Sequence, residues 1–211
     1  MMIPFDYLFN KYSVKPKGVL HCGSSTGQEA ETYKSFGIEN VIWVEAIPDV
    51  FENLEKHLRL VNCETGATCI NACISDVDGK EVIFNVSNNE AQSSSYLSLG
   101  HHLTIHPTVQ YIDKIPMKTV RLDTLLKSTD IADYDFGNFD LQGAELDAMK
   151  GMGDLIKNFK YIYSEINQKE TYIGCPLVEE LDSYLLQFGF ERVETGQWVA
   201  DTWTDGFWIK K

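Results

Sequence analysis

The sequence predicts an α/β fold: a Rossmann-like, doubly wound sheet of seven mostly parallel strands, with an antiparallel element at one edge and helices on both faces. Short β-branched runs alternate with helical stretches along the chain, which is the pattern of right-handed βαβ units. The last two strand-like runs, 190–195 and 206–209, are joined by a short connection that only antiparallel strands can make. With Gly and Pro scattered through its 211 residues, the chain is expected to form one domain over 1–211.

The first half of the chain follows this alternation closely. The run GVLHC at 18–22 is apolar and stops at a glycine, as a buried strand does, and a polar helix is predicted over 26–36. NVIWVE at 40–45 is a second, β-branched strand. Pro48 opens the next helix at its first turn, where the missing N–H costs nothing. A third strand is predicted over 67–74.

The second half departs from strict alternation. Asp78-Gly79 is a turn signal before another β-prone run at 81–86. The polar residues 87–116 are then expected to form an inserted loop region over the active site. The remaining elements are predicted as a short strand over 117–122, a small helix near 123–126, a strand over 134–141, a helix over 144–159, a strand over 160–166 and a helix over 177–188.

Charge and composition exclude several classes of partner. The net charge of −13, from 31 acidic and 18 basic side chains, disfavours binding to nucleic acid or to an anionic membrane surface. No apolar run approaches the ~18–20 residues that span a bilayer, and the amino terminus lacks the layout of a signal peptide. Five cysteines without a C-x-x-C pair are typical of reduced thiols, so the expected location is the cytoplasm.

The ends of the first two strands predict an adenosine-containing cofactor. Such sheets bind ligands beyond the carboxyl ends of the strands, near the point where strand order reverses. Gly23 and Gly27 allow a tight turn and a close approach of backbone to ligand there. Glu45 ends the second strand 22 residues after Gly23, where an acid can accept hydrogen bonds from both ribose hydroxyls. Taken alone, the same residues also suit a plain strand–helix turn beside a solvated acid.

The charge around the glycine turn indicates the chemical class of the cofactor. The spacing is G-x-x-x-G, which is neither the dinucleotide pattern G-x-G-x-x-G nor the phosphate loop G-x-x-x-x-G-K-[ST]. No Lys or Arg lies between Gly18 and Glu31, and Glu29 and Glu31 are acidic. A pyrophosphate would favour the opposite charge, whereas a cationic, phosphate-free sulfonium suits an acidic rim. An NAD-dependent oxidoreductase is therefore the less favoured enzyme.

Five ordered phrases carry a resemblance to a known family: HCGSSTGQE, VEAIPDVFENL, NACISDVDGKEVIF, TVRLDTLL and FDLQGAE, the last followed by a strand ending in Ser164-Glu165. Over roughly 17–166 they resemble the FkbM-type S-adenosylmethionine-dependent methyltransferases. His21 stands where that family often has Asp, and Gln142 where it often has Glu. The resemblance implies S-adenosylmethionine as cofactor, O-methylation, and a small-molecule or glycan acceptor in the cytoplasm. It names neither the acceptor nor the oligomeric state.

The resemblance and the strand ends together suggest which residues bind the cofactor. Ser75 and Asp76, just past the third strand, are expected beside the adenine, with Asp76 accepting from its exocyclic amine. The alternative for Asp76 is that it only belongs to a turn with Gly79. The full expected set is Gly23, Ser24, Gly27, Glu45, Ala46, Ser75, Asp76 and Asp140.

Polar residues just past the fourth and fifth strands are the candidates for catalysis. Methyl transfer requires an acceptor oxygen aligned behind the departing sulfur and a way for its proton to leave. Asp140 or Glu165 can act as a general base. Alternatively Asp140, Glu165 and Asn167 together can hold Mg²⁺, whose charge lowers the pKa of the acceptor hydroxyl. Glu145 has the simpler interpretation of an acid at a helix amino terminus.

The loop region 87–116 and the turn 196–205 are expected to wall the acceptor pocket, where aromatic side chains beside acids suit a sugar or another polyol. Candidate substrate contacts are Ser95, His101, Asn167 and Trp203. The loop histidines lack a Cys or carboxylate at metal spacing, which excludes a zinc site, and the absence of G-x-S-x-G leaves a hydrolase without its nucleophile. The alternative function is a catalytically silent, cofactor-binding module of the same fold.

Overall fold

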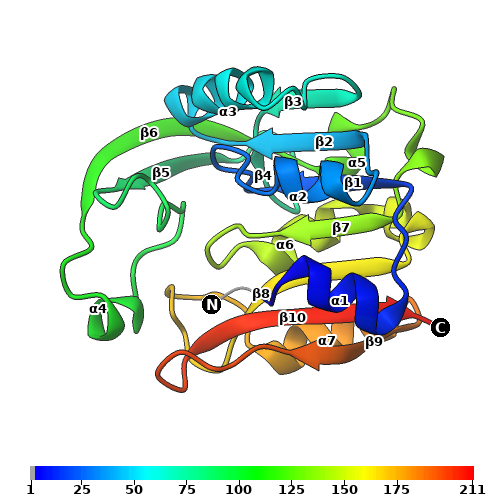
Figure 1. The fold of residues 1–211 in the computed structure, drawn as a ribbon. Helices are drawn as coiled ribbons and strands as arrows, with labels where there is room; N and C mark the ends of the chain where they lie inside the picture. Colours follow the sequence, from blue (N-terminus) through cyan, green and yellow to red (C-terminus); the bar gives the residue numbers. More distant parts are fainter. Residues whose placement is uncertain (1–2) are drawn as a thin grey trace.

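The computed structural model describes residues 3–211 and places a seven-stranded sheet at the centre of the molecule (Figure 1). Five neighbouring strands run parallel, and β10 runs antiparallel to both of its neighbours, β8 and β9. The strands in spatial order are β3 (Ala67–Asn71), β2 (Asn40–Glu45), β1 (Gly18–Cys22), β7 (Phe136–Phe139), β8 (Tyr161–Asn167), β10 (Trp203–Lys210) and β9 (Phe190–Thr195). The order reverses between β1 and β7, and the predicted fold class is confirmed.

Helices cover both faces of this sheet because successive strand residues point to opposite sides. In β1, Val19 packs into one apolar core and Leu20 into the other. The first core lies under α1 (Phe5–Tyr12), α2 (Ala30–Ser35) and α3 (Pro48–Leu60). The second lies under α5 (Leu122–Leu125), α6 (Glu145–Gly151) and α7 (Val178–Leu186). Over the described part of the chain, no helix has the length and apolar content needed to cross a bilayer.

A second, three-stranded sheet leans over the carboxyl ends of the parallel strands (Figure 1). Its order is β4 (Cys73–Ile74), β6 (Tyr111–Val120) and β5 (Glu81–Ser87). The expected third strand over 67–74 is therefore two strands that enter different sheets, separated at Ala72. Because β6 begins at Tyr111, the segment outside the strands is 88–110, which contains the single-turn helix α4 (His102–Ile105).

Two predicted helices are shorter than expected because glycine and turn residues interrupt them. The stretch 26–36 becomes helical only at Ala30, since Ser25 and Gly27 have left-handed backbones (φ 47° and 77°). The helix expected over 144–159 ends at Gly151. It continues past Gly153 (φ 52°) as the 3₁₀ helix η2 (Gly153–Asn158), and another 3₁₀ helix, η1 (Ile131–Asp133), precedes β7. The amino-terminal helix α1 was not predicted.

Candidate functional site

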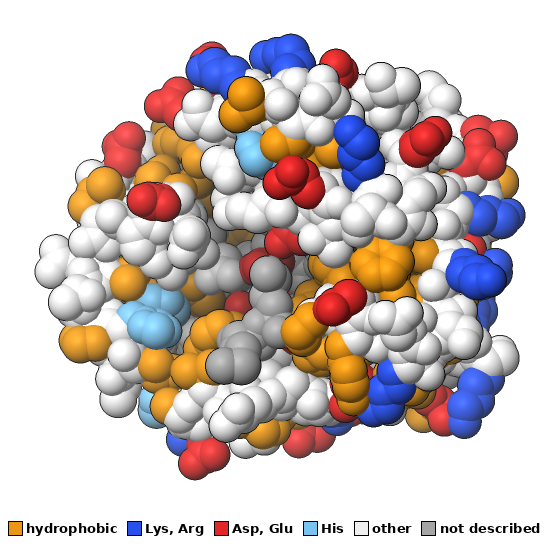
Figure 2. Space-filling model, in the orientation of Figure 1, with side chains coloured by type: hydrophobic (Ala, Val, Ile, Leu, Met, Phe, Trp, Pro, Cys, Tyr) orange, Lys and Arg blue, Asp and Glu red, His pale blue; other side chains and the backbone are white. Residues whose placement is uncertain are grey.

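A cavity of about 490 Å³ lies at the carboxyl ends of the parallel strands, beneath the segment 88–110. Figure 2 shows the hollow, with acidic side chains visible inside it and histidine side chains to one side. Among the described residues that line it there is no Lys or Arg. Its lining carboxylates are Glu29, Glu45, Asp140, Glu165 and Asp205. The acidic rim expected from the glycine turn is thus part of a larger acidic site.

The turn after β1 requires glycine at position 23 for contact with another strand. Gly23 has φ 78°, and a Cβ there would lie 1.7 Å from the carbonyl oxygen of Asp140, which follows β7. The backbone N–H groups of Gly23 and Ser24 both donate to the Val44 carbonyl, at 2.9 and 3.1 Å. Gly23 and Ser24 line the cavity, and Ser24 Oγ is a buried hydroxyl without a partner within residues 3–211. The turn therefore leaves one polar group for a ligand.

Gly27, which the sequence predicts to contact the cofactor, packs closely against α3. It lies outside the cavity lining, and a Cβ there would meet Leu54 Cδ1 of α3 at 2.7 Å. The left-handed backbone of Gly27 brings the chain against α3 before α2 begins. The two glycines of the G-x-x-x-G pattern thus have different roles, which their spacing does not reveal.

Glu45 ends β2 at the cavity wall with both oxygens oriented by backbone donors. Its Oε2 accepts from Ser25 N at 2.9 Å, and its Oε1 accepts from Ile47 N at 2.8 Å. The side chain is buried, and burial raises the pKa of Glu45 to about 7. Glu45 lines the cavity, and each oxygen retains a second lone pair, so the carboxylate can accept two further hydrogen bonds. Ala46, the next predicted contact, also lines the cavity.

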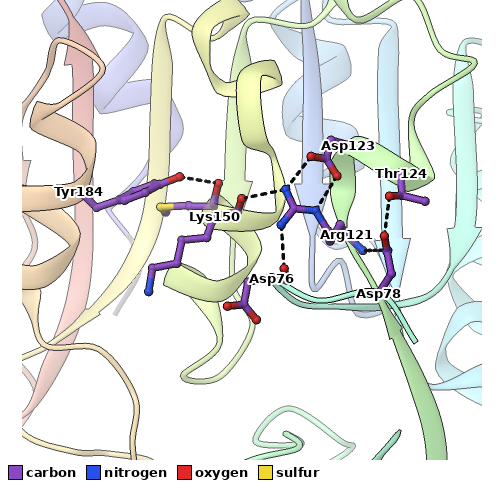
Figure 3. Close-up of polar contacts among 8 residues, drawn as sticks. Asp76, Asp78, Arg121, Asp123, Thr124, Lys150 and Tyr184 are labelled. Atoms are coloured by element: carbon purple, nitrogen blue, oxygen red, sulfur yellow. Dashed lines mark hydrogen bonds and ion pairs between the residues drawn. The ribbon is translucent and has the colours of Figure 1, made fainter. Parts of the chain in front are cut away.

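Ser75 and Asp76 lie behind the cavity wall, outside its lining. Figure 3 shows the contacts that hold this turn: the backbone oxygen of Asp76 accepts from Arg121 Nη1 at 2.7 Å, and the Arg121 guanidinium also forms a bidentate pair with Asp123. Asp78 extends this cluster by accepting from Arg121 N and Thr124 Oγ1. The cluster anchors the turn after β4. The wall expected to face the adenine is apolar instead and is formed by Ala46, Ile47, Val50, Ala72, Cys73 and Ile74.

Gln142 links the two carboxylates proposed for catalysis. Its Nε2 donates to Asp140 Oδ1 at 2.5 Å and to Glu165 Oε2 at 3.3 Å. Tyr172 donates its hydroxyl hydrogen to Gln142 Oε1 at 2.5 Å, which keeps the amide nitrogen toward the carboxylates. The sequence phrase FDLQGAE contained this glutamine, but only as a departure from the family pattern. Tyr172 had no sequence signal.

Glu145 holds the backbone that carries Gln142. Its Oε1 accepts from the N–H groups of Leu141 and Gly143, at 2.9 and 3.1 Å. Gln142 and Gly143 both have positive φ, 52° and 98°, so this turn depends on that support. The Glu145 carboxylate is fully buried outside the cavity lining, and burial raises its pKa to about 7. Its role is more specific than that of an acid near a helix dipole.

Burial and mutual repulsion raise the pKa of the carboxyl groups at the cavity floor. Glu165 and Asp205 are direct partners across the antiparallel pair β8–β10. Burial raises the pKa of Glu165 well above its ordinary range, with further contributions from Glu145, Asp140 and Asp205. Burial and the charge of Asp140 raise the pKa of Asp205 to about 7. Asp140 lines the cavity and is surrounded by protein atoms. Burial raises the pKa of Asp140, and the hydrogen bond from Gln142 opposes this rise. A cation in the cavity would relieve this repulsion.

Asn167 does not join Asp140 and Glu165 as a third oxygen ligand. It is buried outside the cavity lining, and its Nδ2, not its oxygen, faces Glu165 Oε1 at 3.4 Å. Over residues 3–211, no cluster of three or more His, Cys, Asp or Glu side chains is arranged to hold a metal ion. The oxygen of Asn167 is thus not directed at Glu165 as the expected Asp140–Glu165–Asn167 set for Mg²⁺ requires, and the predicted substrate contact of Asn167 lies outside the cavity lining.

The segment 88–110 walls the cavity with neutral polar side chains. Of the predicted acceptor contacts, Trp203 lines the cavity, whereas Ser95 and His101 do not: Ser95 is buried against β5, and His101 is exposed. The structure brings other members of the same segment to the wall. They are Asn89, Gln92, Ser93, Ser94, His102 and His106. The position of a loop residue relative to a pocket depends on tertiary packing, so the polar composition alone could not separate them.

His21, the departure from the family pattern in β1, is a neutral side chain that packs on aromatic rings. Burial lowers its pKa to about 3. Its ring lies 5.2 Å from Trp43 and 6.0 Å from Tyr33, centroid to centroid, and Asn138 Nδ2 lies 3.2 Å from its Nε2. This packing gives His21 a structural role, and the ring also forms part of the cavity wall.

Comparison with known protein families assigns the chain to one of them. The Methyltransferase FkbM domain matches residues 21–192, which is most of the chain and includes the turn after β1, Glu45, Asp140 and Glu165. The chain belongs to the FkbM methyltransferase domain family. The chain is also similar to the 2-O-methyltransferase NoeI of Sinorhizobium fredii, with 29% identity over 116 residues, covering 52% of this chain and 47% of NoeI.

Solved structures share the fold of this FkbM domain. The methyltransferase FkbM from Methylobacillus flagellatus superposes with a TM-score of 0.63 at 14% identity, over 99% of this chain and 48% of that one. Magnesium protoporphyrin IX methyltransferase from Synechocystis, solved with bound S-adenosylmethionine, gives 0.54 at 10% identity, over 98% and 76%. The chain thus spans about half the length of the first two relatives.

Proposed function

We propose that this FkbM domain is an S-adenosylmethionine-dependent O-methyltransferase acting on a hydroxyl of a neutral small molecule or glycan. One observation carries the proposal: a cavity at the topological switch point combines Glu45 at the end of β2 with four more carboxylates and no lining Lys or Arg. A dinucleotide would place its negative pyrophosphate there. A cofactor with a sulfonium and an ammonium group meets complementary charge.

The residues present fit the proposed cofactor. The two free lone pairs of Glu45 can accept from the two ribose hydroxyls, and the buried Ser24 hydroxyl needs a partner. The apolar wall formed by Ile47 and Ile74 suits the flat face of the adenine ring. When bound, S-adenosylmethionine supplies an activated methyl group on a positively charged sulfur.

Asp140 is the group we assign to accept the proton of the acceptor hydroxyl. It opens into the cavity, and Gln142 holds its Oδ1, while Oδ2 makes no hydrogen bond within the described chain. Its raised pKa brings its basicity closer to the operating pH than that of a free aspartate. Glu165, whose pKa is raised further by its neighbours, is suited to remain protonated behind it.

The acceptor we infer is neutral and rich in hydroxyls. The wall formed by the segment 88–110 offers amide, hydroxyl and imidazole groups, and the carboxylates opposite would repel a phosphorylated or carboxylated acceptor. Trp203 supplies an aromatic surface at the same site. The related NoeI is named as a 2-O-methyltransferase, in agreement with transfer to oxygen.

Glu45→Ala should weaken binding of S-adenosylhomocysteine by about 2–3 kcal/mol, since two charge-assisted hydrogen bonds are lost. Isothermal titration calorimetry measures this directly, and Glu45→Gln, which keeps the size of the side chain, should give a smaller loss. Glu31→Ala, an exposed acid beside the same turn, is the matched control. Equal affinity in wild type and a folded Glu45→Ala protein would place the cofactor elsewhere and end the proposal.

A further inference from the structure

His102 is a buried histidine of the cavity wall whose ring is held on two sides. It belongs to α4 in the segment 88–110 and is 5% exposed. Its ring centroid lies 5.5 Å from that of Tyr172 and 5.0 Å from that of His106. Burial and the neighbouring His106 lower the pKa of His102 to about 4, so at neutral pH the ring carries a single hydrogen. Which nitrogen carries it depends on the hydrogen bond made by the other.

The contacts of Ser93 fix that choice. His102 Nε2 lies 3.0 Å from Ser93 Oγ, and Asn89 Nδ2 donates to the same oxygen at 2.9 Å. Asn89 cannot be reversed without loss, because its Oδ1 accepts from the backbone N–H of Ser93 at 3.4 Å as well as from Ser87 Oγ at 2.6 Å, and a backbone N–H can only donate. The hydroxyl hydrogen of Ser93 then has one acceptor among the described contacts, His102 Nε2. Nε2 therefore accepts, and the ring hydrogen lies on Nδ1.

His102 Nδ1 is left as a buried donor without a partner over residues 3–211. An unpaired buried donor is costly, and groups of this kind are normally satisfied by water or a ligand. His102 lines the cavity beside the neutral polar wall, but Nδ1 itself is covered in the ligand-free chain. A ligand oxygen that supplies the missing acceptor must therefore displace part of this cover.

We propose that His102 determines acceptor specificity, its Nδ1–H donating a hydrogen bond to a non-reacting oxygen of a neutral, polyhydroxylated acceptor. This inference rests on the proposed methyltransferase function and adds a positioning residue to it. Because Nδ1 already carries its hydrogen and Nε2 is occupied by Ser93, His102 cannot take the proton of the reacting hydroxyl. Its loss should therefore weaken acceptor binding and leave cofactor binding unchanged.

The tautomer can be measured without any ligand. Two-bond ¹⁵N–¹H correlation spectra of the histidine rings at pH 7, with His102 assigned from the His102→Asn protein, should show a neutral ring protonated on Nδ1. Ser93→Ala removes the group that fixes Nε2 as an acceptor and should shift the equilibrium toward the Nε2–H form. A wild-type His102 that is protonated on Nε2, or on both nitrogens, overturns the inference.

Acceptor binding supplies the second measurement. The probes are methyl glycosides of glucose, galactose and mannose, titrated into protein saturated with S-adenosylhomocysteine, with methyl glucuronide as the charged counterpart. His102→Phe keeps a ring on Tyr172 but has no donor, and should weaken the affinity for any glycoside that binds by about tenfold. His102→Asn places an amide nitrogen at the same number of bonds from the backbone as Nδ1 and should restore affinity to within about threefold. His101→Phe, at the exposed neighbouring position, is the control.

The outcomes separate this inference from the function on which it rests. Failure of wild type to bind S-adenosylhomocysteine overturns the proposed function. Intact cofactor binding with equal glycoside affinity in wild type and His102→Phe overturns the role of His102 alone, as does a panel in which no neutral glycoside binds. Preferential binding of methyl glucuronide also contradicts it, because the proposed acceptor is neutral.

Discussion

Asp140→Asn is expected to reduce turnover by about 10²- to 10⁴-fold while leaving the affinity for S-adenosylhomocysteine within about threefold of wild type. Asparagine keeps the size of the side chain, and its oxygen can still accept from Gln142, so the link to Glu165 survives. What is lost is the negative charge and basicity of Asp140, a cavity-lining carboxylate that is more exposed than Glu165 and Asp205.

Single-turnover rates with a saturating acceptor measure this effect, and Asp154→Asn, at an exposed position of η2 outside the cavity lining, is the control. Full turnover in Asp140→Asn would show that catalysis rests on positioning alone. Activity that is lost with EDTA and restored by Mg²⁺ would contradict a free carboxylate base, because the metal would then activate the hydroxyl.

The free energy of unfolding of the ligand-free protein should fall as the pH rises from about 4 to about 7. Glu45, Glu145 and Asp205 have pKa values of about 7 in the folded protein, above their ordinary values near 4. The folded state therefore binds more protons than the unfolded chain in this window, and stability decreases with increasing pH. Each of these buried carboxyl groups should contribute a loss on the order of 1–3 kcal/mol.

Urea denaturation at pH 5, 6, 7 and 8 tests this dependence. Asp205→Asn removes one titrating group and should flatten the curve, whereas Glu31→Gln, at an exposed site, should leave it unchanged. S-adenosylmethionine should stabilise the protein more at pH 8 than at pH 5, since its positive charges offset ionised carboxylates. Stability that rises with pH across this window would contradict the assigned environment of these groups.

The sequence predicts most of the central sheet because its strands are buried on both faces and leave a simple pattern. NVIWVE becomes β2, and Pro48 begins α3, as its place after a β-branched run indicates. The split of 67–74 was not predicted, because the continuous run ATCINACI does not show that Ala72 leaves one sheet before Cys73 enters another. Strand partners depend on the fold as a whole, whereas the pattern reports only local burial.

The sequence predicted those residues of the candidate site that stand at the carboxyl ends of parallel strands. Glu45, Asp140 and Glu165 all reach the cavity, since the carboxyl ends of parallel strands meet at one edge. Ser75 and Asp76 do not, because Arg121 holds their turn from the other side. This contact joins residues 45 positions apart in the chain, and the local sequence does not predict it.

The pairing of β5 with β6 ends at Ser87 and Tyr111, so the segment 88–110 that covers the cavity begins and ends at neighbouring positions. Asn88 N donates to the Gln110 carbonyl, and Gln110 N donates to Asn88 Oδ1, so the segment 88–110 leaves and re-enters the β5–β6 ladder at one point. Between these ends it also pairs with β5 at Ser95 and with residues 170–173 through backbone hydrogen bonds. Its length and composition can change without altering the spacing of β5 and β6, because closing a longer loop costs little. If the segment 88–110 contacts the acceptor as we propose, exchanging it between relatives together with residues 170–173 should change the acceptor preference without changing the residues proposed for the cofactor.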